Sequence, residues 1–219
     1  MKTNDTTRAI NKKGAMSGIR VLDWTSYQFG PVASSMMGDM GADVVKIESL
    51  DGDIGRAVAR MSSRPIGLEG GRNAYFETCN RNKRGIALDL KTEQGIRIVH
   101  ELVKSADVFV ENFRPGTASR LGLSYENIKQ VKPNIIYCSI SGFGQDGPIS
   151  NRPAYDHIVQ GMCGIMRLTG TTATEPNKVG APYVDYATGL NGAFAPCLVP
   201  RCYGSPPSIK VICYKGGHQ

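Results

Sequence analysis

Short apolar runs and helix-like patterns alternate along most of the chain. Residues 19–24 and residues 43–48 are apolar runs of strand length, so each predicts a buried strand. Between them, Pro31 suits the first position of a helix, because the N–H group that proline lacks would have no acceptor within the helix there. Gly41 suits the end of that helix. Strand, helix and strand with short connections predict a βαβ unit, in which the two strands are parallel.

The same alternation continues to about residue 140. Thr92 can cap a helix whose apolar face includes Val99 and Val103. The pattern as a whole predicts an α/β fold, a doubly wound and mostly parallel sheet covered by helices. Ligands of such sheets bind at the carboxyl ends of the strands. The further elements are predicted strands at residues 85–90, 107–111 and 134–140 and a predicted helix at residues 124–132.

Three stretches break this pattern. Residues 51–84 are rich in Gly, Arg and Asn, and we expect them to form an irregular surface segment or a lid. Residues 1–16 are polar and basic without the apolar stretch of a secretory signal, so we expect a disordered tail. In residues 196–219 prolines crowd together, and no helical or strand period is visible before residues 208–213. We therefore expect an atypical, frameshifted or otherwise non-native tail behind one domain of residues 17–195.

Composition narrows the functional classes. With 41% hydrophobic and 21% charged residues, the sequence is typical of a soluble globular protein, and no apolar run approaches the ~20 residues that span a bilayer. The net charge of +7 comes from scattered Lys and Arg with few aromatic residues, which disfavours nucleic acid and leaves a phosphate-rich small ligand open. The six cysteines contain no Cys-x-x-Cys pair and no histidine clusters near them. We therefore predict no metal site and expect reduced, buried thiols.

A glycine-rich loop follows the strand that ends near residue 140. Gly142, Gly144 and Gly147 have the spacing of a dinucleotide-binding fingerprint. The helix that this fingerprint requires is not indicated, because Pro148 comes next and Asp146-Gly147-Pro148 is typical of a turn. A loop that another ligand approaches closely is the better interpretation.

Two polar positions stand at the ends of apolar elements. Residues 112–116, Asn-Phe-Arg-Pro-Gly, follow a strand. The Phe113 ring and the Arg114 guanidinium can hold a nucleotide there. A simple Pro-Gly turn explains these residues equally well. Asp185 ends a predicted extended segment that begins at residue 179, and an apolar helix is predicted at residues 190–195. Its carboxylate is either a helix cap or a nucleophile beside N–H groups that stabilise an oxyanion.

Several blocks of the sequence resemble class III CoA-transferases, the carnitine dehydratase and formyl-CoA transferase type. They run in order over residues 17–195, which corresponds to the N-terminal half of such an enzyme. The pattern is most similar to that of succinate–hydroxymethylglutarate CoA-transferases. The blocks are residues 21–25 with Gly30-Pro31, 38–48, 80–91, 110–116, 137–148, 152–170 and 179–189.

The resemblance implies a fold, a reaction and partners. The fold would be a truncated, Rossmann-like large domain, and two full-length chains would interlock as a homodimer. CoA would pass from an acyl-CoA donor to a carboxylic acid acceptor through an aspartyl mixed anhydride and an enzyme–CoA thioester, with CoA as a substrate and no cofactor. Asp185 would be the catalytic nucleophile. The residues implied to bind CoA or substrate are Gln28, Phe29, Leu88, Lys91, Asn112, Phe113, Arg114, Arg120, Ser141, Gly142, Phe143, Gly144 and Tyr155.

Two other functions stay open. CoA-thioester racemases of this family place a His where this chain has Tyr155, and His157 lies two residues further on. Residues i and i+2 of a helix do not share a face, so CoA transfer is favoured over α-proton exchange, and Asp156 and His157 suit a helix terminus. The unusual tail also leaves an inactive CoA-binding fragment open. We expect a cytoplasmic location, with the mitochondrion as the alternative, and neither membrane nor nucleic acid as a partner.

Overall fold

A six-stranded parallel sheet forms the centre of the computed structural model, which describes residues 14–61, 64–203 and 209–214. Every neighbouring pair of strands in this sheet is parallel. In sheet order the strands are β5 (Lys83–Ala87), β2 (Asp43–Glu48), β1 (Arg20–Trp24), β6 (Val108–Glu111), β7 (Ile136–Ser141) and β8 (Ile209–Tyr214). This arrangement confirms the predicted doubly wound α/β fold.

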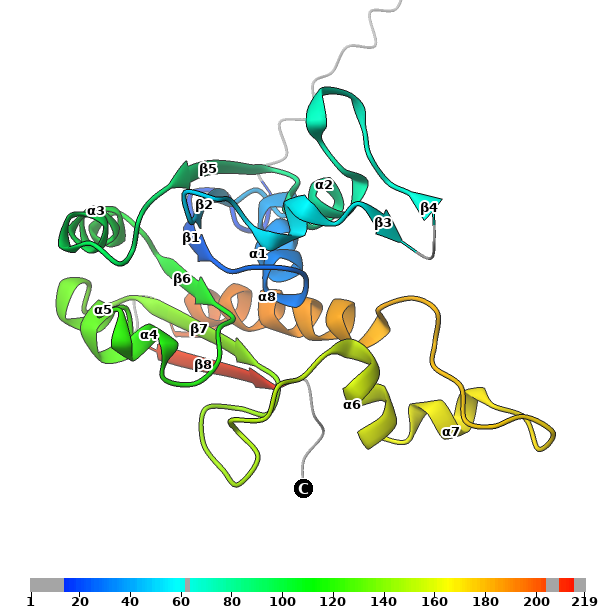
Figure 1. Ribbon diagram of the computed structural model, residues 1–219. Helices are drawn as coiled ribbons and strands as arrows, with labels where there is room; N and C mark the ends of the chain where they lie inside the picture. Colours follow the sequence, from blue (N-terminus) through cyan, green and yellow to red (C-terminus); the bar gives the residue numbers. More distant parts are fainter. Residues whose placement is uncertain (1–13, 62–63, 204–208, 215–219) are drawn as a thin grey trace, which may run out of the picture.

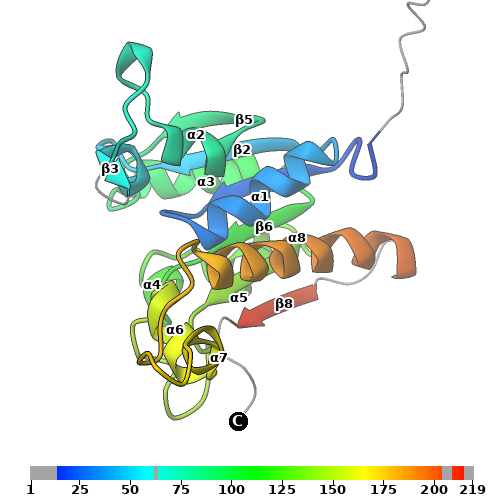
Figure 2. The ribbon, with the colours of Figure 1, turned by 90° about the vertical axis from the view of Figure 1, so that its right-hand side faces the viewer.

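Helices cover both faces of the sheet (Figures 1 and 2). On one face, α1 (Phe29–Asp39) and α8 (Tyr183–Tyr203) lie side by side over Val21, Val108 and Cys138. The other face packs against the helices that follow β5 and β6, which are α3 (Glu93–Lys104), α4 (Thr117–Arg120) and α5 (Tyr125–Val131). Successive strand residues therefore belong to two separate cores, as strand geometry requires.

Two smaller units extend from this body (Figure 1). The first lies in the region predicted to be irregular. It includes a helix that was not predicted, α2 (Ala74–Asn80), capped by the Asn73 side chain, which accepts the Phe76 N–H at 2.7 Å. The second follows β7. The first unit contains η1 (Ile54–Ala57), β3 (Arg60–Met61), β4 (Arg64–Pro65), η2 (Glu69–Gly71) and α2 (Ala74–Asn80), and the second contains α6 (Asp156–Met162) and α7 (Ile165–Thr169).

Most predicted elements are present, with shifted ends. The Thr92 hydroxyl caps α3 by accepting the Gly95 N–H at 3.1 Å, which confirms that prediction. Gly41, with φ of 98°, directly follows the residue that caps the end of α1, as predicted. Pro31 is the third residue of α1 rather than the first, because the helix begins at Phe29. The strand predicted at residues 85–90 lies at Lys83–Ala87, where the chain pairs with β2.

The largest correction concerns the chain around Asp185 and beyond residue 195. The segment predicted to be extended turns helical at Tyr183, and α8 continues through Pro196 to Tyr203. The carbonyl of Gly192, whose usual helical partner is the N–H that Pro196 lacks, accepts the Cys138 thiol at 3.7 Å. Residues 209–214 form β8, which pairs with β7 and was not predicted. The origin of residues 196–219 stays a prediction.

The two ends of the chain fall partly outside the described residues. The prediction of a disordered tail concerns mostly residues 1–13, which lie outside them. Met16 does not belong to such a tail, because its side chain is buried in the core and its N–H donates to the Met40 carbonyl at 2.9 Å. In the part of the chain that the structure describes, every helix is too short or too polar to cross a membrane.

Candidate active site

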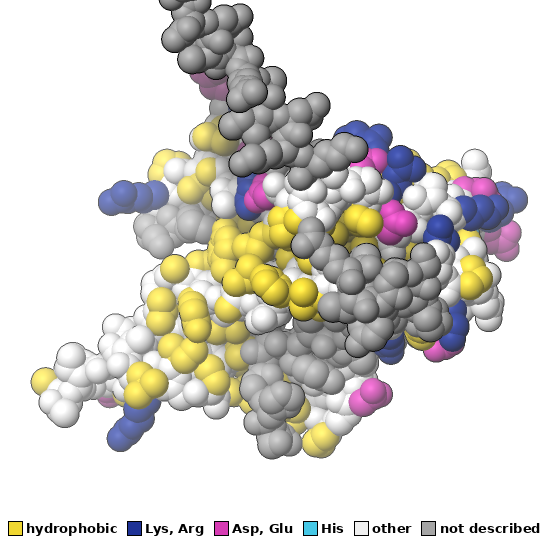
Figure 3. All heavy atoms as spheres, turned by 180° about the vertical axis from the view of Figure 1, so that it is seen from behind, with side chains coloured by type: hydrophobic (Ala, Val, Ile, Leu, Met, Phe, Trp, Pro, Cys, Tyr) yellow, Lys and Arg dark blue, Asp and Glu magenta, His cyan; other side chains and the backbone are white. Residues whose placement is uncertain are grey.

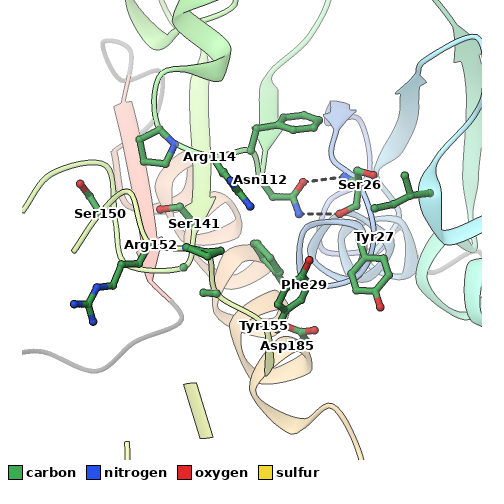
Figure 4. A pocket seen from close by; sticks show the side chains of 16 residues that line it. Ser26, Tyr27, Phe29, Asn112, Arg114, Ser141, Ser150, Arg152, Tyr155 and Asp185 are labelled. Atoms are coloured by element: carbon green, nitrogen blue, oxygen red, sulfur yellow. Dashed lines mark hydrogen bonds between the residues drawn. The ribbon is translucent and has the colours of Figure 1, made fainter. Parts of the chain in front are cut away.

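The site lies where the sheet changes winding direction. From β1 the chain continues to β2 on one side, and from β6 it continues to β7 on the other, so the loops after β1 and β6 leave a crevice between them. Two hydrogen bonds join these loops, from the Ser26 N–H to Asn112 Oδ1 at 2.8 Å and from Asn112 Nδ2 to the Ser26 carbonyl at 2.9 Å (Figure 4). A Cβ atom on Gly30 would lie 2.6 Å from Asn112 Cγ, so this approach requires glycine.

The first pocket occupies this crevice and has a volume of about 330 Å³. Arg114 and Arg152 supply positive charge and Phe29 supplies aromatic surface (Figure 4), to which Phe113 adds a second ring. The Ser141 hydroxyl is buried and has no hydrogen-bond partner among the described residues. The pocket can therefore take a ligand with both anionic and apolar parts. It is lined by Ser26, Tyr27, Phe29, Ile54, Asn112, Phe113, Arg114, Pro115, Ser141, Gly142, Ser150, Arg152, Pro153, Ala154, Tyr155 and Asp185.

Asp185 lies in the first turn of α8, with only 4% of its surface exposed. It is a residue within the helix and not the cap of a helix that starts later, which corrects the sequence interpretation. Its N–H donates to Asp156 Oδ2 at 3.0 Å, and the other oxygen of Asp156 accepts from the Gln160 side chain. Gln160 Oε1 accepts the Val179 N–H at 2.8 Å. The N-terminus of α6 thus fixes the chain that enters α8.

A second pocket of about 340 Å³ lies on the other side of Asp185. Asp185 lines both pockets, together with Tyr27 and Tyr155, and so stands at their junction. His157 also lines the second pocket, and its ring stacks on that of Tyr155 with 6.0 Å between centroids. The expectation that these two positions point to different sides is therefore wrong, because Tyr155 precedes the helix as its N-cap.

Gln28 is held at the wall of this second pocket. Its side chain is buried, and the Tyr75 hydroxyl donates to Gln28 Oε1 at 3.1 Å. Burial raises the pKa of Tyr75 above its ordinary value, so the phenol stays protonated and remains a donor. The Gln28 Nε2 group is then the end of the amide that can donate to a ligand.

Two buried ion pairs brace the loop after β1. Lys46 Nζ lies 2.8 Å from Asp53 Oδ2 and donates to the Thr25 carbonyl at 2.8 Å. Lys83 Nζ lies 2.8 Å from Asp23 Oδ2. Burial alone would raise the pKa of Asp53. The Lys46 ammonium acts against burial and holds this pKa below its ordinary value. Burial lowers the pKa of Lys83 to about 8. These charges are compensated within the protein, so we assign them to support of the loop.

The buried Glu111 connects three parts of the site. One oxygen accepts the Phe113 N–H at 2.9 Å, and the other accepts the Ser139 hydroxyl at 2.5 Å. Gln145 of the glycine-rich loop donates to the Ser139 hydroxyl at 2.8 Å. Burial raises the pKa of Glu111, although both hydrogen bonds act in the opposite direction. This chain of contacts sets the position of the loop after β6 relative to the loop after β7.

The structure brings most of the expected site residues together, but not all of them. Nine line one or both pockets: Asp185, Gln28, Phe29, Asn112, Phe113, Arg114, Ser141, Gly142 and Tyr155. Leu88 is buried in the core beneath α3, so its side chain does not reach either pocket. Lys91, Arg120, Phe143 and Gly144 also lie outside both linings.

Sequence reasoning missed several residues of the two pockets. Arg60 and Tyr75 lie in the segment predicted to be irregular, and Lys178 directly precedes the segment predicted to be extended. Ser150 and Arg152 follow the glycine-rich loop. No hydrophobic period marks these positions, and only tertiary packing brings them to Asp185. Among the described residues, no three His, Cys, Asp or Glu side chains are grouped so that they could hold a metal ion.

Comparisons with known proteins identify the family. The family model described as CoA-transferase family III matches residues 16–199. Over 181 residues the chain is 43% identical to a succinate–glutarate CoA-transferase of Agrobacterium fabrum, and this match covers 82% of the chain and 45% of that protein. It is also 43% identical to a formyl-CoA:oxalate CoA-transferase of Streptomyces avermitilis, over 81% of the chain and 42% of that protein.

A solved structure shows the same fold. The crystal structure of a CAIB/BAIF family protein from Brucella suis superposes with a TM-score of 0.82 at 40% identity, over 91% of this chain and 52% of the other. The chain thus spans about half the length of the proteins that it matches. On the match to the family model and on these identities, the chain belongs to CoA-transferase family III.

Proposed function

We propose that the Asp185 carboxylate is the nucleophile that transfers CoA from an acyl-CoA to a carboxylic acid. One observation supports this above all, which is that Asp185 stands at the junction of the two pockets. The first pocket, with Arg114, Arg152 and two aromatic rings, suits CoA. The second suits the acyl group. The thioester carbonyl of a bound acyl-CoA then lies at the carboxylate.

The reaction follows from this placement. An oxygen of Asp185 attacks the thioester carbonyl, the C–S bond breaks, and CoA leaves as the thiolate beside a mixed anhydride. The thiolate attacks the aspartyl carbonyl, which releases the donor acid as a carboxylate and leaves an Asp185–CoA thioester. The acceptor carboxylate attacks that thioester and the thiolate leaves again. The thiolate then attacks the acceptor's acyl carbonyl, which yields the new acyl-CoA and free Asp185.

A carboxylate is a weak nucleophile in water, so its surroundings must favour attack. Asp185 is almost completely buried, which removes competing water. We assign to the Gln28 amide, which the Tyr75 hydroxyl orients, the role of donor to the oxyanion that develops at the carbonyl. The Asp156 carboxylate accepts the Asp185 N–H and so fixes the backbone of the residue that carries the proposed nucleophile.

The test is direct detection of the covalent intermediate. We expect incubation with an acyl-CoA to add the mass of CoA to the peptide that contains Asp185, and hydroxylamine to convert that residue to a hydroxamate. Asp185→Asn should give no adduct, whereas Asp146→Asn, in an exposed turn, should react like the unchanged chain. Absence of any adduct at Asp185 would refute the proposal and favour a non-catalytic CoA-binding role.

A racemase is the second candidate function, because His157 lines the same pocket as Asp185. Two acid–base groups on opposite sides of an α-carbon would exchange its proton. In that case, α-deuterium would enter the acyl-CoA in D₂O without any acceptor acid, and His157→Ala would abolish the exchange. CoA transfer predicts no such exchange.

A further inference from the structure

Three sulfur atoms from distant parts of the chain meet at the margin of the core between the sheet and its α1–α8 layer. Cys197 Sγ, on α8, lies 3.2 Å from Met16 Sδ and 3.9 Å from Met40 Sδ. Met16 belongs to the turn before β1, and Met40 is the residue that caps the end of α1. Because the three residues are so far apart in the sequence, no metal-ligand spacing marks them there.

Backbone and thiol contacts fix the positions of these sulfur atoms. The Met16 N–H donates to the Met40 carbonyl at 2.9 Å, which holds the two methionines next to each other. Cys197 reaches them because α8 lies along α1 (Figure 2). The Cys197 thiol donates to the Ala193 carbonyl of the preceding turn at 3.0 Å, which sets the direction of its side chain. The fold thus brings one thiol and two thioethers together before any ligand binds.

The surroundings of the cluster combine shelter with access. Met16 is only 2% exposed and belongs to the same core as Val21 and Ala42, whereas Met40 and Cys197 are half-buried at its margin. A net charge is costly in such apolar surroundings. A monovalent cation held by one thiolate and two neutral thioethers forms a neutral complex, but a divalent cation would leave one positive charge uncompensated. The cluster therefore suits a monovalent ion.

We propose that Met16, Met40 and Cys197 bind a single soft, monovalent metal ion of the Cu(I) class. Thiolate and thioether sulfurs are the ligands that select Cu(I). On binding, the metal replaces the proton of the Cys197 thiol, which passes to water, and each thioether donates a lone pair, so that no electron is transferred.

The distances between the sulfur atoms fit such a site. Three metal–sulfur bonds of about 2.3 Å in a trigonal arrangement separate the sulfurs by about 4 Å. The distance of 3.9 Å between Cys197 Sγ and Met40 Sδ already matches this separation. From 3.2 Å, the Met16 thioether has to withdraw by about 1 Å, which the three rotatable bonds of a methionine side chain allow.

Competition with the chromophoric chelator bicinchoninate, under oxygen-free and reducing conditions, measures Cu(I) binding by the 219-residue chain. We expect Met16→Leu with Met40→Leu to weaken binding by about 10–100-fold, since loss of even an outer partner of a metal site typically costs this much. Leucine preserves the size and apolar character of methionine, so the core stays packed. Cys197→Ser should weaken binding further, because it removes the anionic ligand.

Two control variants separate the cluster from other sulfur atoms of the chain. Met36→Leu changes another half-buried methionine of α1, which lines an apolar groove with Leu190, about two turns before Cys197 on α8. Cys163→Ser removes an exposed cysteine at the end of α6. Both control variants should bind Cu(I) as tightly as the unchanged chain does.

X-ray absorption at the copper edge is an independent readout, in which the unchanged chain should show three sulfur neighbours at about 2.3 Å. This measurement needs no variant, so it decides the question even if a substitution disturbs the fold, which circular dichroism checks. Equal Cu(I) binding by the unchanged chain and the double methionine variant would overturn the proposal. So would failure of the unchanged chain to compete with the chelator, or a bound copper ion without sulfur neighbours.

Discussion

A hydrogen bond from the Tyr75 hydroxyl orients the Gln28 amide. Loss of one oxyanion donor typically lowers a rate by about 10²–10³, so we expect Gln28→Ala to slow formation of the Asp185 adduct by that factor. Tyr75→Phe keeps the ring but removes the hydroxyl that orients the amide. Since a neutral hydrogen bond contributes about 1 kcal/mol, we expect a loss of roughly fivefold.

The measurement is the rate of adduct formation at saturating acyl-CoA, followed by intact-protein mass spectrometry. Tyr125→Phe, on the opposite face of the sheet, is the control for removing a phenol. If Tyr75→Phe slowed the reaction as much as Gln28→Ala, the hydroxyl itself would contact the reacting atoms. An unchanged rate in Gln28→Ala would remove the amide from the mechanism.

At the scale of elements, Glu111 makes the contact between the loop after β6 and the loop after β7 sensitive to pH. Its pKa lies above the ordinary value of 4.5 because of burial, so the folded chain holds this proton more tightly than the unfolded chain. The contribution of Glu111 to the free energy of unfolding is therefore largest at low pH. It declines as the pH rises above 4.5, until the group ionises in the folded state.

Glu111→Gln should remove that decline, because the amide does not titrate. Urea denaturation between about pH 4 and pH 7, compared between variant and unchanged chain, isolates this one group from the carboxylates whose pKa is lowered. Glu126→Gln, at an exposed position in the first turn of α5, should leave the pH profile unchanged. Parallel profiles for Glu111→Gln and the unchanged chain would contradict the prediction.

The contact between α1 and α8 depends on the absence of a side chain at Gly189. A Cβ atom there would lie 2.6 Å from Val32 Cγ1 and 3.0 Å from the Phe29 carbonyl. Alanine is the better helix former, yet we expect Gly189→Ala to destabilise the fold by about 1–3 kcal/mol, as overpacking does. The same shift of α8 should slow the reaction at Asp185, one turn earlier on the helix.

Gly161→Ala is the matched control, because its Cβ would meet Met166 Sδ at 3.7 Å, an ordinary contact, within helix α6. That substitution should leave the fold as stable as before or more so. Chemical denaturation of both variants measures the difference. A Gly189→Ala chain as stable as the unchanged one would mean that α8 moves away from α1 without cost.

These contacts explain what the sequence could predict. The strands of the sheet carry apolar residues on both faces, as Val108-Phe109-Val110 does, so a continuous run reveals each strand. The start of α8 was missed because Pro182-Tyr183-Val184 carries no helical period. Tertiary contacts make the segment helical. They are the packing of α8 on α1 and the hydrogen bond from the Asp185 N–H to the Asp156 carboxylate. Arg60 and Lys178 escaped notice for the same reason.

At the scale of the whole molecule, the sheet and its two helical layers form one half of the proteins that the chain matches. The half contains the proposed nucleophile, both pockets and the switch point of the sheet. One side of the second pocket is lined by segments that project from the body, the chain around β3 and the chain between α7 and α8 (Figures 1 and 2), and the other side by the loop after β1 and the start of α8.

Apolar side chains also remain exposed on this half, and Figure 3 shows hydrophobic residues gathered across one face of the molecule. On α8, Leu190, Phe194 and Leu198 are 51%, 59% and 49% exposed and recur every four residues, so they form a stripe on one side of the helix. An apolar groove of about 540 Å³ that includes Met36 and Tyr183 continues the surface. Contiguous apolar surface of this kind drives association.

We therefore expect the 219-residue chain to bind the dye ANS and to self-associate as its concentration rises. Leu190→Gln with Phe194→Gln should weaken both effects without altering the circular dichroism spectrum, because neither side chain is part of the core. Leu168→Gln removes an apolar side chain that is 85% exposed on α7, away from the stripe, and should change neither effect. Sedimentation velocity over a range of concentrations measures association. Association that persists in the double variant would place the contact elsewhere on the molecule.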